Sequence, residues 1–175
     1  MSELEATIRK YIRDVPDFPQ PGIIFKDITP LLADKAAFKL VIDTVCSRWA
    51  GSPPDLVAAI EARGFIPGGA VARALGAGFV PIRKPGKLPW KTVSQDYQLE
   101  YGTDQLQVHE DAVQPGQSVL IVDDVLATGG TSSAAVELIR KLGGVVLGVH
   151  VLIELSFLDG RARLPGVEVV SEVIY

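Results

Sequence analysis

Residues 118–131 read Ser-Val-Leu-Ile-Val-Asp-Asp-Val-Leu-Ala-Thr-Gly-Gly-Thr, and the fold prediction begins from this segment. The apolar residues Val119–Val122 are typical of a strand that is buried on both faces, as in a parallel sheet. Two acids, Asp123 and Asp124, follow this strand, and apolar spacing over residues 134–142 predicts a helix after the loop. This order indicates an α/β fold with a central, mostly parallel sheet flanked by helices.

The loop between this strand and this helix has the composition of a phosphate site. A helix N-terminus offers unpaired backbone N–H groups and a partial positive charge, and Gly129 and Gly130 let the backbone approach a ligand closely. Thr128 and Thr131 add hydroxyl donors, whereas ionised carboxylates only accept hydrogen bonds and therefore suit a sugar diol. A ribose 5-phosphate satisfies both ends of the segment. The alternative, in which the acids only cap the helix or solvate a loop, is disfavoured by the Thr-Gly-Gly-Thr that follows them.

At these residues the chain resembles the type I phosphoribosyltransferases, which bind 5-phosphoribosyl 1-pyrophosphate (PRPP). The segment Val122–Thr131 matches the signature of that family. The resemblance implies that the acids contact the ribose 2′- and 3′-hydroxyls and that the loop holds the 5′-phosphate. It also implies a homodimer, and Mg²⁺ that arrives with PRPP rather than in a dedicated protein cage. The residues that the resemblance assigns to the ribose and 5′-phosphate are Asp123, Asp124, Ala127, Thr128, Gly129, Gly130 and Thr131.

Two basic segments are candidates for binding pyrophosphate. Arg63 follows an expected strand at residues 56–60, and residues 83–91 contain four basic side chains and no acid. A guanidinium is well suited to a phosphate oxyanion, and a basic arm would attract a polyanion to a chain of net charge −4. A surface arginine and an ordinary solvated loop are the alternatives. The resemblance implies that pyrophosphate is bound by Arg63, Arg83, Lys84 and Lys87, some of them across a dimer interface, and it gives Trp90 no role.

The N-terminal part of the chain resembles the small hood of the adenine-specific branch of this family. The matching segments are Pro16-Asp17-Phe18-Pro19, Pro21-Gly22 and Phe25-Lys26-Asp27-Ile28. In that branch the hood covers the base with backbone groups and an aromatic face. The resemblance therefore implies an adenine site at Ile24, Phe25, Lys26 and Leu126.

Residues 95–108 are predicted to form the two strands of a flexible β-flap that turns at residues 101–104. Within it, Leu99-Glu100-Tyr101-Gly102 resembles the catalytic loop of the same branch. The resemblance implies that Glu100 approaches the imidazole edge of the purine and assists proton movement there. An ordinary solvated carboxylate is the alternative for Glu100.

Length and composition limit the remaining possibilities. A chain of 175 residues favours a single domain, with the hood at residues 1–33 and a core at residues 34–175 that includes the flap at about 84–108. A net charge of −4 does not suggest bulk nucleic-acid binding, and the single Cys46 excludes an internal disulfide and fits a reducing compartment. No apolar run approaches the ~20 residues of a transmembrane helix, and the first residues lack the features of a signal peptide. We therefore expect a cytoplasmic protein without membrane or nucleic-acid partners.

The resemblance implies the reaction of adenine with PRPP to give AMP and pyrophosphate, in purine salvage. Two alternatives remain open: a related transferase for xanthine or hypoxanthine, and a non-catalytic regulator that senses PRPP. A regulator needs a nucleic-acid surface, and the basic run at residues 83–91 coincides with the expected pyrophosphate segment.

Overall fold

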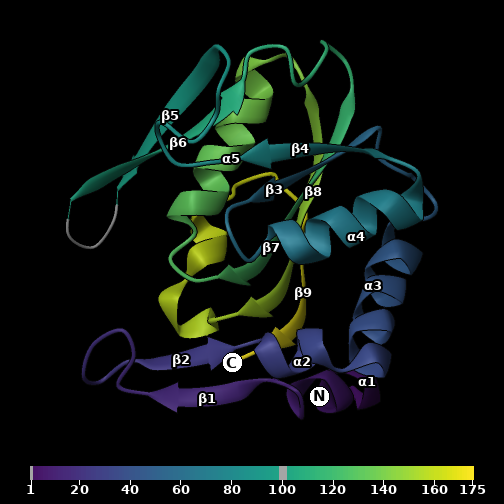
Figure 1. Cartoon of the computed structure of the whole chain (residues 1–175), viewed down its shortest axis with the longest axis vertical. Helices are drawn as coiled ribbons and strands as arrows, with labels where there is room; N and C mark the ends of the chain where they lie inside the picture. Colours follow the sequence, from purple (N-terminus) through teal and green to yellow (C-terminus); the bar gives the residue numbers. More distant parts are fainter. Residues whose placement is uncertain (1, 99–101) are drawn as a thin grey trace.

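The computed structural model describes residues 2–98 and 102–175, and these form a five-stranded parallel sheet and two antiparallel hairpins (Figure 1). The strand order β4-β3-β7-β8-β9 confirms the predicted α/β class. The sheet strands are β3 (Leu56–Ile60), β4 (Gly78–Ile82), β7 (Ser118–Leu126), β8 (Val145–Glu154) and β9 (Val169–Ile174). The hairpins are β1 (Arg13–Pro16) with β2 (Ile24–Asp27), and β5 (Thr92–Gln98) with β6 (Thr103–His109). The helices are α1 (Glu3–Arg9), α2 (Thr29–Ala33), α3 (Lys35–Trp49), α4 (Phe65–Leu75) and α5 (Gly130–Lys141), with short 3₁₀ helices η1 (Ser156–Leu158) and η2 (Gly160–Arg163).

The central sheet separates two apolar cores. On one face α5 and the β5–β6 hairpin cover the sheet, and on the other face it is covered by α1 to α4 (Figure 1). Val119 and Ile121 of β7 pack in the first core, and Leu120 and Val122 pack in the second. All four side chains are fully buried, which confirms the prediction of a strand buried on both faces.

The central strand β7 and the helix α5 are both longer than the sequence pattern indicates. β7 continues through both acids to Leu126, because its pairing with β8 extends as far as Leu126 and Glu154. α5 begins at Gly130 rather than at residue 134, and Ser133 N already donates to Gly129 O at 2.9 Å. The residues at both boundaries are of types typical of turns, so composition alone hides the regular structure there. The acids therefore lie in the last part of a paired strand rather than in a loop.

The β1–β2 hairpin lies across the end of the molecule at which the last strand finishes (Figure 1). Contacts around Tyr175 attach this hood to the core. Lys26 Nζ lies 3.8 Å from the centroid of the Tyr175 ring, and Arg9 Cζ lies 4.1 Å from it. Arg9 Nη2 also donates to the carbonyl of Ile174 in β9 at 2.6 Å. The hood is thus held against β9 by cation–π contacts and a charged hydrogen bond.

The long helix α3 begins where its cap residue predicts. Asp34 Oδ1 accepts hydrogen bonds from Ala36 N at 3.0 Å and from Ala37 N at 2.9 Å. These bonds satisfy two of the backbone donors that are left free at a helix start. Among the described residues, none of the helices is both long enough and apolar enough to cross a membrane.

Candidate functional site

A cavity of about 250 Å³ lies at the carboxyl ends of β3 and β7. Ligands of open α/β sheets bind at this edge. The cavity brings together the end of β7, the loop before α5, the loop after β3 and the start of the basic segment. The sequence-predicted residues that line it are Arg63, Lys84, Asp123, Asp124, Ala127, Thr128, Gly129 and Thr131.

The loop before α5 is shaped by the close approach of two backbones. Gly129 has a φ of +80°, in the left-handed region that favours glycine. A Cβ atom added to Gly129 would lie 2.2 Å from the carbonyl oxygen of Gly160, and one added to Gly160 would lie 2.3 Å from that of Ala127. The loop therefore presents the N-terminus of α5 to the cavity without space for a larger residue. Gly130, which was also predicted to bind the phosphate, is buried. It lines an adjacent hollow beside Gln98 and is not part of the wall of this cavity.

The two acids at the end of β7, here called the acid pair, are buried carboxylates. Asp123 is 7% exposed and Asp124 is 5% exposed. Burial raises the pKa of Asp123 well above its ordinary value, and the neighbouring carboxylate of Asp124 raises it further. Burial also raises the pKa of Asp124, although the guanidinium of Arg63 opposes this rise. Hydroxyl donors from a ligand would relieve the unfavourable burial of these two groups.

Arg63 reaches the acid pair from the loop after β3. Its Nε lies 2.8 Å from Asp124 Oδ2, but the two atoms are not in hydrogen-bond geometry. Among the described residues, neither Asp124 Oδ2 nor Arg63 Nη1 has a hydrogen-bond partner, although both atoms are buried. Buried polar atoms without partners are costly, so these atoms point to a ligand that supplies them. Gly64 makes the approach possible, since a Cβ there would lie 2.6 Å from Asp123 Oδ1.

Carboxylates and one phenol hold the first two residues of the basic segment. Arg83 Nε donates to Glu61 Oε2 at 2.8 Å, and Lys84 N donates to Glu61 Oε1 at 2.5 Å. Lys84 Nζ donates to Tyr97 Oη at 2.7 Å and forms an ion pair with Asp104. Burial opposes the charge on Glu61, but the hydrogen bonds from Lys84 and Arg83 outweigh it and lower its pKa. The basic segment is therefore anchored by specific contacts rather than free in solvent.

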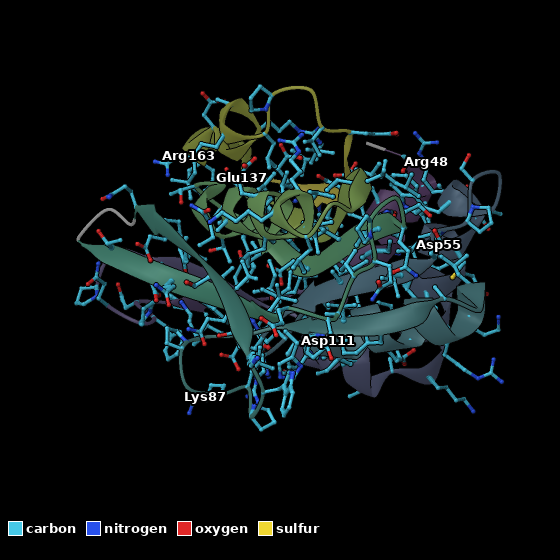
Figure 2. All side chains as sticks on the ribbon, turned by 90° about the horizontal axis from the view of Figure 1, so that it is seen from above. Arg48, Asp55, Lys87, Asp111, Glu137 and Arg163 are labelled. Carbon is cyan, nitrogen blue, oxygen red and sulfur yellow. The ribbon has the colours of Figure 1, made fainter. Side chains whose placement is uncertain are left out.

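The structure separates Lys87 from the other residues predicted to bind pyrophosphate. Arg63 and Lys84 line the cavity, and Arg83 contacts Glu61 in its wall. Lys87 is exposed and is not part of that wall. Figure 2 shows it at the edge of the molecule, with its side chain directed outward.

A second cavity, of about 210 Å³, lies beneath the hood and adjoins the first. Both cavities are lined by Arg63, Val125 and Ala127. The Arg63 guanidinium carbon lies 4.5 Å from the centroid of the Phe25 ring, which closes one side of this space. A mostly apolar slot with few polar groups suits a flat heterocyclic base. The predicted base residues that line it are Ile24, Phe25 and Lys26.

The structure places Leu126, which was predicted to contact the base, outside the lining of the cavity beneath the hood. The Leu126 side chain is 1% exposed and packs in the core with α5, whereas Val125 packs on the hood side and lines the cavity beneath the hood. Leu120 and Val122 of the same strand also pack on the hood side, so a strict period of two would have placed residue 126 there. The alternation shifts across the acid pair, and Val125 therefore occupies the position expected for Leu126.

Six residues that line the first cavity are not among the predicted site residues, and they are Ile60, Glu61, Ala62, Tyr97, Val125 and Ser132. Glu61 directly precedes the Ala-Arg-Gly of the predicted pyrophosphate loop, and that position was a usable signal. Tyr97 carried no comparable local signal, because only the packing of the β5–β6 hairpin brings its hydroxyl to Lys84. Glu100, the predicted proton-transfer residue, lies outside the described residues.

Known proteins resemble this chain over nearly its whole length. Residues 31–168 match the family model of the phosphoribosyl transferase domain. The adenine phosphoribosyltransferase of Thermotoga sp. (strain RQ2) is 58% identical over 168 residues, which cover 96% of this chain and 99% of that protein. The crystal structure of the enzyme of that name from Thermoanaerobacter pseudethanolicus has a TM-score of 0.95 and 52% identity, and covers 97% of this chain and 99% of its own. The Saccharomyces cerevisiae structure, complexed with D-2,5-dideoxy-2,5-imino-altritol 1,6-bisphosphate and adenine, has a TM-score of 0.92 and 35% identity, and covers 98% and 99%.

The similarity is not limited to the signature around the acid pair. It extends over the hood, the sheet and the two cavities, because the matched lengths include nearly all of both chains. The proteins named above share one activity, and none of them favours the xanthine, hypoxanthine or regulatory alternatives. This chain therefore belongs to the adenine phosphoribosyltransferases, a family of pentosyltransferase enzymes built on the phosphoribosyl transferase domain.

Proposed function

We propose that this chain transfers the 5-phosphoribosyl group of PRPP to adenine and releases AMP and pyrophosphate, as a step of purine salvage. The observation that carries the proposal is the wall that the two cavities share, formed by Arg63, Val125 and Ala127. A site suited to an anionic sugar opens there onto an apolar slot suited to a base. Transfer between two bound reactants requires this contact, since catalysis depends on holding them at reacting distance.

The sugar phosphate would occupy the cavity next to α5. Its 5′-phosphate would accept hydrogen bonds from the backbone at the start of α5 and from the hydroxyls of Thr128 and Thr131. Its ribose hydroxyls would donate to the acid pair, and its pyrophosphate would extend toward Arg63 and Lys84. The sugar carbon becomes positively charged as pyrophosphate leaves. The protein would therefore act mainly by stabilising the charge of the leaving group and by aligning the base.

The base would occupy the slot beneath the hood. Phe25 and Val125 line this slot and offer apolar surface to the faces of a purine. The edge of a purine carries both donors and acceptors, which backbone groups of β2 near Ile24 and Lys26 can match. Lys26 Nζ is already paired with Asp14 at 2.7 Å, which favours recognition by the backbone of Lys26 rather than by its side chain.

Magnesium is part of the same proposal, as the ion that PRPP brings to the site. The residues present fit this role, since two carboxylates, Asp123 and Asp124, line the cavity, and within the described residues Asp124 Oδ2 has an ion pair with Arg63 but no hydrogen-bond partner. Mg²⁺ usually binds one or two carboxylates together with phosphate oxygens and water. When bound, the ion would neutralise charge on pyrophosphate. The acid pair would hold it near Arg63, either directly or through water.

We also propose that the chain forms a homodimer. The packed elements α4 and β4 expose Ile66 at 47% and Phe79 at 40%, and burial of these apolar side chains against a second copy would favour a dimer. Lys87 is exposed and outside its own cavity, so a second copy offers it a phosphate site to reach. Sedimentation velocity of the purified chain should give the mass of two copies, and the mass of one copy would contradict the dimer.

A cytoplasmic location completes the proposal. The chain has one cysteine, Cys46, and therefore has no internal disulfide that would require an oxidising compartment. Burial raises the pKa of the Cys46 thiol, which also lowers its reactivity. Fractionation of cells that express the full chain would test this location.

A panel of bases in a coupled pyrophosphate assay tests the function directly. With PRPP and Mg²⁺ supplied, adenine should give turnover, and hypoxanthine, xanthine and guanine should give little. A preference for a 6-oxopurine would contradict the proposed base. Absence of turnover with every base, together with normal PRPP binding, would contradict the proposed reaction.

Glu100→Leu is expected to lower kcat by about a hundredfold, the lower end of the usual contribution of general acid–base catalysis. The variant should fold and bind PRPP normally, because the proposed role of Glu100 concerns the base alone. Single-turnover kinetics and PRPP calorimetry separate the two quantities. Asp111→Leu, which removes an exposed acid beyond β6, is the matched control and should keep the wild-type rate. Near-normal turnover of Glu100→Leu would remove Glu100 from the mechanism.

A further inference from the structure

Lys84 lies between the cavity proposed for pyrophosphate and two side chains of the β5–β6 hairpin. Lys84 lines the cavity proposed for pyrophosphate, yet its Nζ already pairs with Asp104 of β6 and donates to Tyr97 Oη at 2.7 Å. Tyr97 Oη in turn donates to Asp104 Oδ2 at 3.2 Å. The three groups form a closed network between the basic segment and the β5–β6 hairpin.

The main chain of Lys84 is fixed independently of this network. Its backbone N–H donates to Glu61 Oε1 at 2.5 Å. The preceding residue, Arg83, forms an isolated β-bridge with Gln107 of β6, with backbone hydrogen bonds of 2.9 and 2.7 Å. The Lys84 side chain can therefore change partners while its backbone stays in place beside the cavity.

The surroundings of the pair favour exchange rather than a permanent bond. The Lys84 and Asp104 side chains are 39% and 31% exposed, so water and ligands reach both of them. The hydrogen bond from Lys84 lowers the pKa of Asp104, and Asp104 stays charged at neutral pH. Burial opposes the charge of Lys84, but its bonds to Asp104 and Tyr97 outweigh burial and raise its pKa. Neither group loses its charge when the pair separates, and a polyanion can therefore compete with Asp104 for the ammonium group.

We propose that Asp104 is a positioning residue that holds Lys84 in the empty site, yields it to pyrophosphate on binding, and takes it back when pyrophosphate leaves. This inference rests on the proposed function, because it needs pyrophosphate at Lys84. Asp104 acts as an internal competitor: part of the binding energy of pyrophosphate is used to separate Lys84 from Asp104. Its consequence is weaker binding of the product and faster release.

The direction of the predicted effect distinguishes this role from a structural one. Asp104→Asn keeps the shape of the side chain but removes its charge, so Lys84 becomes available to the ligand. Binding of Mg²⁺-pyrophosphate should become about threefold to fivefold tighter, the range expected for an ion pair that is partly exposed to solvent. Damage to the fold would weaken binding, so tighter binding cannot arise from a structural defect.

Asp96 provides a matched control on the same hairpin. It is an exposed acid of β5 whose carboxylate accepts a hydrogen bond from Gln105 Nε2 at 2.7 Å and does not contact Lys84. Asp96→Asn removes the same charge from the same hairpin and should leave pyrophosphate affinity unchanged. If Asp96→Asn tightened binding as much as Asp104→Asn, the effect would be general repulsion and the proposal would be overturned.

Isothermal titration of Mg²⁺-pyrophosphate into the full chain measures these affinities, with product inhibition as a second readout. In a Lys84→Ala background, Asp104→Asn should have no further effect, because the double-mutant cycle isolates the pair. Unchanged or weaker binding by Asp104→Asn would overturn the inference while the proposed function stands. Failure of the wild type to bind pyrophosphate would instead overturn the proposed function.

Discussion

Gly129→Ala is expected to lower kcat/KM for PRPP by about a thousandfold. Misplacement of a bound substrate and removal of a backbone hydrogen-bond donor each lower the rate of a reaction by about a hundredfold or more. The Cβ atom would lie 2.2 Å from the carbonyl oxygen of Gly160, a contact with backbone that no side-chain rotation relieves. The loop before α5 would have to move away from η2, and its N–H groups would leave the positions proposed for binding the 5′-phosphate. Steady-state kinetics with PRPP as the varied substrate measure the loss.

Gly116→Ala is the matched control for this variant. Gly116 has a φ of +86°, close to the +80° of Gly129, but a Cβ there meets no atom within 4 Å. Both variants should lose about 1–2 kcal/mol in free energy of unfolding from the left-handed backbone alone. Gly129→Ala should lose more stability and nearly all activity, and Gly116→Ala should keep its activity. Comparable kinetics for the two variants would show that the contact with Gly160 does not shape the phosphate loop.

Replacement of both members of the acid pair by asparagine is expected to weaken PRPP binding by about a thousandfold, since each charged hydrogen bond contributes about 1.5–3 kcal/mol. An asparagine keeps one acceptor oxygen but loses the charge and the second acceptor that a ribose diol uses. Calorimetric titration of PRPP with Mg²⁺ measures this loss. Unchanged affinity would contradict the placement of the ribose against Asp123 and Asp124.

Asp123→Asn alone should have effects of opposite sign on binding and on stability. It should weaken PRPP binding, yet raise the free energy of unfolding of the empty protein at neutral pH. Asp123 is a buried carboxylate whose pKa is raised by burial and by the charge of Asp124, so its ionised form is unfavourable in the folded state. An asparagine side chain at this position would carry no charge and could still accept the hydrogen bond that Asp124 N now donates at 2.9 Å.

The dependence of this gain on pH follows from the direction of the pKa shift. The folded-state pKa of Asp123 lies above the ordinary value of 3.8, so the folded state retains a proton that the unfolded state has released. The stability of the wild type therefore falls as pH rises from the ordinary value through the raised one. Thermal unfolding should show the advantage of Asp123→Asn at neutral pH and little advantage below 3.8. Asp124→Asn, which leaves Arg63 unpaired, should not be stabilising, and a loss of stability in Asp123→Asn at neutral pH would contradict the argument.

The parts of the site that depend on residues close together in the sequence could be predicted from the sequence alone. The order of buried strand, acid pair, glycine-rich loop and helix was correct, because apolar period, turn residues and helix-start residues all act locally. The cap of α3 is another local feature, because Asp34 accepts hydrogen bonds from backbone groups two and three residues later. The end of β7 and the start of α5 were not predicted correctly. At the end of β7, sheet pairing with β8 overrides the turn preference of aspartate.

The local order of the chain was enough to determine the α/β class, the position of the glycine-rich loop before α5 and the presence of an acid pair before that loop. Only the tertiary structure decided that Arg63 lies against Asp124, that Glu61 and Asp104 hold the basic segment, and that Val125 rather than Leu126 lines the cavity beneath the hood. These contacts join segments that are distant in the chain, and their geometry depends on how strands align and on where the alternation along β7 shifts. The spacing of apolar residues indicates which face of a helix or strand is apolar. It does not indicate which charged side chain of another element will contact that helix or strand.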